Sequence, residues 1–212
     1  MQVNATDTFG SGTGLTVTEA ARRAQIIDAT IATVAELGYS KASFAKIVER
    51  AGLSSTRMIS YHFGTKSDLM LATVGQIVDN QDTFLMARLG DQTGRREMLR
   101  GYIESEIAFV GAYPQQAQAL MEIGANARDG NATPLLDEVW KAIRIGRLGR
   151  QLVQGQREGA FGQFAVDVMA QTIRQALDGV PARLAHQPDL DLATYGRELA
   201  DLFDRATRPV AD

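Results

Sequence analysis

The densest group of chemically active side chains lies at residues 51–66, AGLSSTRMISYHFGTK. It holds His62, one of only two histidines in the chain, together with hydroxyls, an arginine and a lysine. The stretch could be a catalytic pocket centred on His62 or a surface that binds another molecule. A catalytic histidine needs an orienting acid and either a nucleophile or a metal. No such set lies close to His62 in the sequence, so we predict no catalytic residue here.

Composition excludes several kinds of site. The chain has 212 residues, of which 45% are hydrophobic and 22% charged, the usual balance of a globular protein. It has no cysteine, which excludes disulfides, thiolate zinc sites and a cysteine nucleophile, and we predict neither a metal nor a cofactor. No apolar run approaches the roughly 20 residues that span a bilayer. Residues 1–16 lack the basic and apolar regions of a secretory signal. We expect them to form a flexible arm, on a cytoplasmic protein with no membrane partner.

The charge is unevenly distributed, although the net charge is only −3. Residues 17–66 hold seven Lys and Arg against four acids, whereas residues 67–212 hold fifteen against twenty. A basic head on an acidic body is typical of a chain that binds a polyanion at one end.

The spacing of apolar residues predicts an all-α protein. Apolar side chains recur every three or four residues nearly throughout, and strand-like alternation is absent. Capping boxes are expected at Thr16 with Glu19 and at Thr65 with Asp68, and Ser43 should cap a short helix. The predicted helices are near 17–37, 44–51, 54–63, 66–89, 94–112, 115–127, 134–156, 165–186 and 191–206.

Two of these helices are joined by a glycine turn inside the stretch quoted above. Gly52 ends one helix, Leu53 fills the turn, and the next helix is expected to begin at Ser54 or Ser55. Two short helices joined in this way, behind a supporting helix, form a helix-turn-helix. The second helix has an apolar side for docking, made of Met58, Ile59 and Phe63. Its other side presents polar groups: Ser55, Thr56, Arg57, Ser60 and Tyr61.

These polar groups suit double-stranded DNA. An arginine can pair with guanine through two hydrogen bonds, and a hydroxyl can bind a base edge or a phosphate. The helix N-termini capped by Ser43 and Thr65 would offer backbone amides to phosphates. Lys46 and Lys66 add positive charge beside them. The stretch therefore favours a binding surface over a catalytic pocket.

A longer run carries a resemblance to a known family. Its motifs are Ile-Ile-x-Ala from Ile26, Glu-Leu-Gly-Tyr at 36–39, Ile-Val-x-x-Ala-Gly-Leu-Ser at 47–54, and Tyr-His-Phe-x-x-Lys-x-x-Leu at 61–69. In this order and spacing, residues 24–75 resemble the DNA-binding head of the TetR/AcrR-like (tetracycline-repressor-type) transcriptional regulators. One spacing departs from the family, because the distance from Gly52 to Phe63 is one residue longer than usual. This leaves open which side chains of the third helix reach the bases.

The resemblance implies which residues touch DNA. In the family these lie at the start of helix two, along helix three and at the start of helix four. Carried over by motif position, the predicted DNA contacts are Ser43, Lys46, Ser55, Thr56, Arg57, Ser60, Tyr61 and Lys66.

The resemblance also implies that residues 17–66 form a DNA-binding domain and residues 67–212 a helical domain that binds a ligand and dimerises. Methionines and aromatic residues adapt to apolar ligands, and buried polar groups orient them, although each of these residues could equally belong to a plain core. The candidate ligand residues are Met86, Tyr102, Phe109, Met121, Glu122, Asn126 and Trp140. The final two predicted helices are expected to complete the core or to build the dimer interface. The candidate interface residues are Met169, Ile173, Leu177, Tyr195, Leu199 and Leu202.

A basic stripe recurs every three residues at Lys141, Arg144, Arg147 and Arg150. The first interpretation of such a stripe is a solvated helix face. The alternatives are contact with an acidic ligand or with acids of a partner chain.

The resemblance predicts a ligand-responsive transcriptional regulator that is not an enzyme. We expect a homodimeric repressor, released from a pseudo-palindromic DNA operator by a small, largely apolar molecule. One alternative is a small-molecule-binding helical protein whose head no longer binds DNA. The other is a helical hydrolase that uses His62 or His186.

Overall fold

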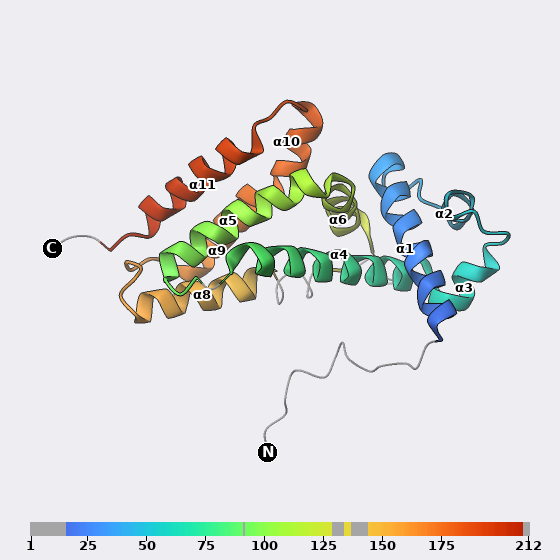
Figure 1. The fold of residues 1–212 in the computed structure, drawn as a ribbon, viewed down its shortest axis with the longest axis horizontal. Helices are drawn as coiled ribbons and strands as arrows, with labels where there is room; N and C mark the ends of the chain where they lie inside the picture. The colour runs from blue at the N-terminus through green and yellow to red at the C-terminus, as the bar shows by residue number, and fades with distance from the viewer. Residues whose placement is uncertain (1–15, 91, 129–133, 137–143, 210–212) are drawn as a thin grey trace, which may run out of the picture.

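A computed structural model of the chain describes residues 16–90, 92–128, 134–136 and 144–209, and its regular elements there are α-helices (Figure 1). This confirms the predicted all-α class. The predicted flexible arm falls on residues outside the described ones, except for Thr16. The helices are α1 (Val17–Leu37), α2 (Phe44–Ala51), α3 (Arg57–Phe63), α4 (Lys66–Leu89), α5 (Arg95–Ala112), α6 (Pro114–Asn126), α8 (Gly146–Arg157), α9 (Val166–Asp178), α10 (Val180–His186) and α11 (Leu192–Thr207).

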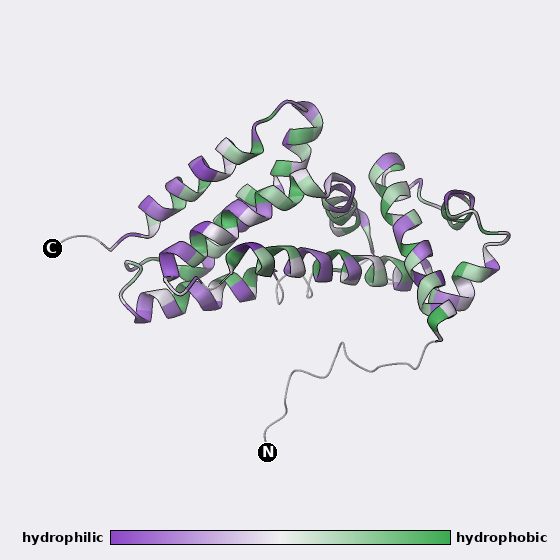
Figure 2. Cartoon of the chain, in the orientation of Figure 1, coloured by the Kyte–Doolittle hydropathy of each residue, from purple (hydrophilic) through white to green (hydrophobic). Residues whose placement is uncertain are grey.

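The molecule has a small head and a larger body. The helices α1, α2 and α3 lie together at one end, and the long helix α4 leads from them into the body, where α5, α8, α9 and α11 gather (Figure 1). The helix α6 lies between the body and α1. Each helix carries both hydrophobic and hydrophilic residues, as amphipathic helices around a shared core do (Figure 2).

Side-chain caps set the starts of the head helices, as predicted. Thr16 with Glu19 and Thr65 with Asp68 form complete capping boxes, in which each hydroxyl accepts a backbone N–H and each carboxylate accepts one in return. Ser43 accepts the N–H of Lys46 at 3.3 Å. These local contacts satisfy N–H groups that would otherwise lack an acceptor at a helix start.

The turn between α2 and α3 depends on Gly52, whose backbone is left-handed at φ 63° and ψ 32°. The N–H of Leu53 then closes the turn on the carbonyl of Val48 at 3.0 Å. The predicted start of the third helix at Ser54 or Ser55 is wrong, because α3 begins at Arg57. Thr56 precedes it without a side-chain cap, and the Ser55 hydroxyl instead accepts the N–H of Arg57 at 3.2 Å.

Two predicted helices of the body have the wrong extent. The helix expected at 134–156 does not begin at Pro134, which pairs with Arg128 in an isolated bridge and is followed by a turn at 135–136. Residues 137–143 lie outside the described ones, and the regular helix α8 begins at Gly146. The helix expected at 165–186 is divided at Gly179 into α9 and α10. Pro181 explains the division, because it has no N–H to donate to the carbonyl four residues earlier.

Buried side chains form two clusters. The first joins the three head helices to α4 and α6, through residues such as Ile26, Ile47, Ile59, Leu69 and Ile123. The second lies wholly in the body and includes Ile103, Leu152 and Ile173. Each such buried aliphatic side chain contributes about 1.5–3 kcal/mol. The first cluster crosses from the predicted DNA-binding domain into the predicted second domain, so the division at residues 66 and 67 stays a prediction about function.

None of the described helices is long and apolar enough to cross a membrane.

The left-handed turn at Gly52 predicts a specific loss of stability. Replacing Gly52 with Ala should lower the free energy of unfolding by about 1–2 kcal/mol, because a residue with a Cβ is strained in this conformation. No atom lies within 4 Å of the added Cβ, so a clash does not contribute. Gly52→Asn is the matched control, since asparagine tolerates left-handed backbone better. Equal losses for both variants in urea unfolding would contradict the backbone explanation.

Candidate DNA-binding face and ligand cavity

The head presents a polar face made of the start of α2, the turn and α3. Ser43, Lys46, Arg57, Ser60 and Tyr61 are exposed there, and Tyr61 keeps 75% of its surface. Ser55 and Thr56 are exposed as well, whereas Lys66 is half-buried. On the opposite side of α3, Ile59 and Phe63 are buried in the head core. The predicted contacts are thus accessible, with Lys66 partly covered, and whether they touch DNA stays a prediction.

The helix α1 fixes the position of α3 and of the turn before it. The Arg23 guanidinium donates to the carbonyl of His62 and lies 4.1 Å from the centre of the Phe63 ring. The Gln25 amide donates to the carbonyl of Ala51 at 2.6 Å. Arg23 is a positioning residue that the sequence did not single out. Arg23 and His62 are 39 positions apart, and only the folded structure brings them together.

His62 has a structural setting. Its carbonyl accepts from Arg23, and its ring packs edge to face against Tyr61, with 5.0 Å between ring centres. Within the described ranges, no three His, Asp or Glu residues stand close enough to hold a metal ion.

Lys66 and Tyr39 connect the start of α4 to the end of α1. The Lys66 ammonium donates to the carbonyl of Tyr39 at 3.0 Å and lies 4.4 Å from the centre of its ring. Burial lowers the pKa of Lys66. An ammonium has three N–H donors, so the contact with Tyr39 leaves donors on Lys66 for a phosphate.

Tyr39, which follows α1, is also connected to the body. The backbone N–H of Tyr39 donates to the Glu122 carboxylate of α6 at 3.2 Å. The Asn126 side chain donates to the carbonyl of Glu122 at 3.0 Å and is exposed. Glu122 and Asn126 therefore belong to the contact between head and body. Neither lines the body cavity described next, and their role as ligand contacts stays a prediction.

The body has a small cavity between α4, α5, α8 and α9, of about 60 Å³. Two predicted ligand residues, Met86 and Tyr102, line it. Two others, Phe109 and Met121, instead line a neighbouring space of about 20 Å³, and Trp140 lies outside the described residues. Gln81, Glu106, Arg144 and Arg174 line both spaces, so the wall between them is polar.

That wall is a buried ionic cluster. Glu106 accepts from Arg174 at 3.0 Å and from the Gln81 amide at 3.1 Å. Asp178 pairs with Arg174 at 2.9 Å and with Arg144 at 3.0 Å, and the second carboxylate contact of Arg144 is Glu106 at 3.9 Å. Among the described residues, two guanidinium groups thus face two carboxylates. Charges are buried at low cost only when they are paired and hydrogen-bonded in this way.

Burial and neighbouring charges shift the titrating groups of the cluster. Burial, with the Glu106 charge beside it, raises the pKa of the Tyr102 phenol to about 12. Burial lowers the pKa of Arg144, and the nearby Arg174 lowers it further. Burial acts in the same direction on Arg174, but Glu106 and its other neighbours outweigh it and raise that pKa. At neutral pH the phenol is therefore protonated and both guanidinium groups are charged.

The solvated-face interpretation of the basic stripe is wrong for Arg144, whose side chain is only 8% exposed. Arg147 is 45% exposed and makes a two-bond ion pair with Asp82 of α4, at 2.7 and 3.0 Å. Lys141 lies outside the described residues.

The sequence analysis did not single out Glu106 or Arg174. Each is a charged residue at a position where the helix otherwise places apolar side chains. A charged residue at such a position could have indicated a buried ion pair.

The candidate dimer residues do not share one surface. Ile173 and Leu177 are buried in the body core of the single chain, at 0% and 3% exposure, so they have no surface left for a second copy. Met169, Tyr195 and Leu199 are half-buried. Leu202 is 52% exposed.

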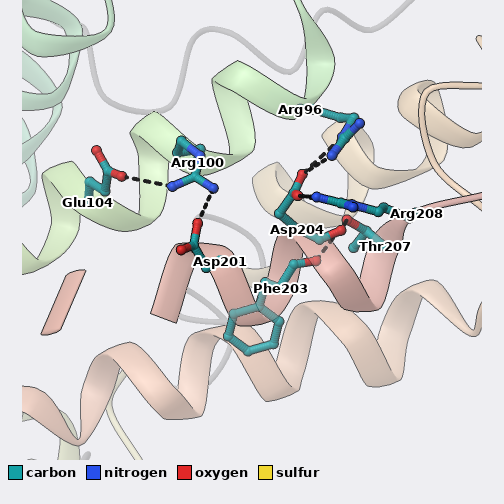
Figure 3. A network of polar contacts seen from close by, with 8 residues as sticks. All are labelled: Arg96, Arg100, Glu104, Asp201, Phe203, Asp204, Thr207 and Arg208. Atoms are coloured by element: carbon teal, nitrogen blue, oxygen red, sulfur yellow. Dashed lines mark hydrogen bonds and ion pairs between the residues drawn. The ribbon is translucent and has the colours of Figure 1, made fainter. Parts of the chain in front are cut away.

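The inner side of α11 is fixed to α5 by ion pairs (Figure 3). Asp204 accepts from Arg96 at 2.9 Å and from Arg208 at 2.7 Å, and Asp201 accepts from Arg100. Phe203 is buried beneath them. Because this side of α11 faces its own chain, only the outward side that carries Leu202 is free for another molecule.

The buried cluster predicts unequal effects of two arginines. Arg174→Met should lower the free energy of unfolding by about 3 kcal/mol, because it leaves Glu106 buried without its close partner. Arg147→Gln removes a half-exposed pair and should cost about 0–1 kcal/mol. Chemical denaturation of both variants would test this. An Arg174→Met loss no larger than the Arg147→Gln loss would show that Arg174 does not neutralise Glu106.

Known proteins resemble this chain in sequence, and a family model matches its head. Residues 26–73 match the family model of bacterial regulatory proteins, tetR family. The regulator BetI of Cronobacter sakazakii is 27% identical over 185 residues, which cover 84% of this chain and 91% of BetI. BetI 1 of Chromohalobacter salexigens is 36% identical over 84 residues, which cover 39% of this chain and only 41% of that protein.

Solved structures share the whole fold. The fatty acid degradation regulator FadR of Bacillus halodurans superposes with a TM-score of 0.75 at 22% identity, covering 87% of this chain and 99% of that one. FadR of Bacillus subtilis, determined in complex with stearoyl-CoA, gives a TM-score of 0.72 at 20% identity, covering 84% and 96%. With the helix-turn-helix at residues 44–63 and the family match over it, the head is of the tetR type, and the chain as a whole is similar to TetR-like transcriptional regulators.

Proposed function

We propose that the chain binds a pseudo-palindromic DNA operator as a homodimer and is released from it by a small, largely apolar molecule. The observation that carries the proposal is the two-sided α3, with Ile59 and Phe63 buried and Arg57, Ser60 and Tyr61 exposed. As a repressor of transcription it would act in the cytoplasm, and the names of its relatives describe regulators and no enzyme.

The exposed side of α3 supports base recognition. Arg57 and Tyr61 are four residues apart, so they lie one above the other on the same face of the helix. Arg57 is at the first position of α3 and can enter the major groove ahead of the helix. Its guanidinium would pair with guanine, and the hydroxyls of Ser60 and Tyr61 would bind a base edge or the backbone.

The two neighbouring helix starts support phosphate binding unequally. The start of α4 holds the Asp68 carboxylate in its capping box, which already satisfies the positive helix end. The first turn of α2 has no acid, and Lys46 lies within it. We therefore assign a backbone amide contact to α2, and a contact through the Lys66 side chain to α4.

A dimer would place two heads on successive major grooves, about 34 Å apart or a multiple of that distance. The exposed apolar residues Val168 of α9 and Leu202 of α11 support an interface on these two helices. We retain Met169, Tyr195, Leu199 and Leu202 in this interface. Ile173 and Leu177 are removed, because their own chain buries them.

The body cavity supports the response to a ligand. The helix α4 carries Lys66 at one end and the cavity residues Asp82, Leu85 and Met86 at the other. A ligand that widens the cavity would move α4, and α4 would move the head. By linkage, DNA must weaken ligand binding by the same factor by which the ligand weakens DNA binding.

Two alanine variants test the proposed DNA contacts. Lys66→Ala should weaken binding to all sequences alike and reduce the dependence on salt, since it removes a phosphate contact. Arg57→Ala should relax the preference at particular base pairs, where a two-bond pair with guanine gives about 1–3 kcal/mol of discrimination. The readout is fluorescence anisotropy on an operator and on its single base-pair variants, at several salt concentrations.

Arg157→Ala is the matched control, because it removes one positive charge at the far end of the body. It should leave both sequence preference and salt dependence unchanged. Equal loss on every sequence from Arg57→Ala would place Arg57 on the backbone instead of a base. No effect from any head variant would contradict the DNA-binding face.

A further inference from the structure

The body cavity is amphipathic. Its apolar side consists of residues from α4 and α8, including Val78, Leu85 and Leu148. Its polar end is formed by Tyr102 of α5 and by Arg144 beside it. A molecule that fits both ends has an apolar part and one polar group.

The polar end presents hydrogen-bond donors. The Tyr102 hydroxyl accepts from Arg174 at 2.9 Å, and no acceptor for its own proton lies among the residues that the structure describes. Glu106 Oε2 and Asp178 Oδ1 already accept from arginines, and Glu106 Oε2 also accepts from Gln81. A polar group that enters here meets the Tyr102 hydroxyl as a donor, and an oxygen acceptor satisfies it.

The outer end of the cavity is spanned by the ion pair between Arg147 of α8 and Asp82 of α4. Both residues line the cavity, and their side chains are 45% and 36% exposed. Asp82 can therefore turn into water without a large cost. Exposed ion pairs of this kind contribute only about 0–1 kcal/mol, so another anion can compete for Arg147.

We propose that the effector is an amphipathic organic anion, such as a carboxylate with a short apolar chain, whose oxygens take over Arg147 from Asp82 and accept from Tyr102. This inference rests on the proposed role of the cavity as the effector site. It goes beyond that role by naming the chemical class of the ligand and the exchange by which it enters.

Charge balance favours an anion with this exchange. Among the residues that the structure describes, the inner cluster of Arg144, Arg174, Glu106 and Asp178 carries no net charge. An added carboxylate alone would leave it with a surplus negative charge, which a buried site tolerates poorly. When Arg147 turns from Asp82 to the ligand, the enlarged cluster is neutral again, and the Asp82 carboxylate is hydrated instead.

A cationic ligand fits less well. Its charge would lie beside Arg144 and Arg147, whereas the nearby carboxylates are already engaged by arginines. Like charges close together in a low-dielectric site repel strongly.

The exchange would also let the ligand change the position of the head. The Arg147–Asp82 pair links α8 to α4, and it is the contact that the ligand would replace. Loss of this link frees the body half of α4. The other end of the same helix carries Lys66 and its contact with Tyr39 of the head.

The experiment compares three eight-carbon probes by isothermal titration calorimetry on the full chain, namely octanoate, octanol and octyltrimethylammonium. Octanoate should bind about tenfold more tightly than octanol, as expected for a charge-assisted hydrogen bond. Octyltrimethylammonium should bind no better than octanol. Equal binding of octanoate and octanol, or tighter binding of the cation, would overturn the proposal.

Two charge variants test the exchange itself. Arg147→Gln should weaken octanoate about tenfold, whereas Asp82→Asn should tighten it about threefold, because Asn competes poorly for Arg147. Arg150→Gln, an exposed arginine on the same helix that does not line the cavity, should change nothing. Weaker octanoate binding by Asp82→Asn would contradict the exchange. Octanol binding should be the same in all three variants.

DNA binding, measured separately on the same proteins, distinguishes this inference from the proposed function. Sequence-specific DNA binding without preference for octanoate would overturn only the inference. Octanoate binding without DNA binding would overturn the regulator and leave the anion site standing.

Discussion

The head and the body of this protein are held together by one shared hydrophobic core. Ile123 of α6 is fully buried in the same cluster as Ile26, Ile47 and Ile59 of the head. At the edge of this core, the Glu122 carboxylate accepts the N–H of Tyr39, and the carbonyl of Tyr39 accepts from Lys66. The DNA-binding face therefore has no freedom to turn independently of α4 and α6. A displacement of either helix must move α3 or disrupt the core, and this constraint gives a ligand in the body an effect on DNA.

The body adds a second constraint, which is electrostatic. A cluster of two arginines and two acids is buried between α5, α9 and the start of α8. The cost of burying these charges is offset because each lies beside an opposite charge. The cluster lines the cavity, so any molecule that enters meets a neutral but strongly polar wall. The ion pair between Arg147 and Asp82 lies at the outer end of the cavity. It is weaker than the buried ion pairs because water reaches it. Because this pair joins α8 to α4, we propose that the ligand acts on α4 at this point.

Much of the head could be predicted from sequence because its signals are local. The caps at Thr16, Ser43 and Thr65 and the turn at Gly52 each depend on residues within five positions of one another. The body was harder, because its polar contacts join distant residues. Glu106 and Arg174 are 68 positions apart, and no periodicity pairs them. Periodicity also shows that Ile173 and Leu177 are buried without showing against what, and their own chain proved to be the answer. The contact of Glu122 was unpredictable for the same reason, since its partner Tyr39 is 83 positions away.

The most direct test of this account is selection of DNA from a random duplex library by the full chain, followed by a salt titration on the selected site. The account predicts enrichment of a pseudo-palindrome whose half-sites lie about one helical turn apart, or a multiple of it. The logarithm of its affinity should fall linearly with the logarithm of salt concentration, with a slope of about −0.9 for each phosphate contact. No enriched sequence, together with no detectable binding to any duplex at low salt, would contradict the assignment of the α3 face to DNA.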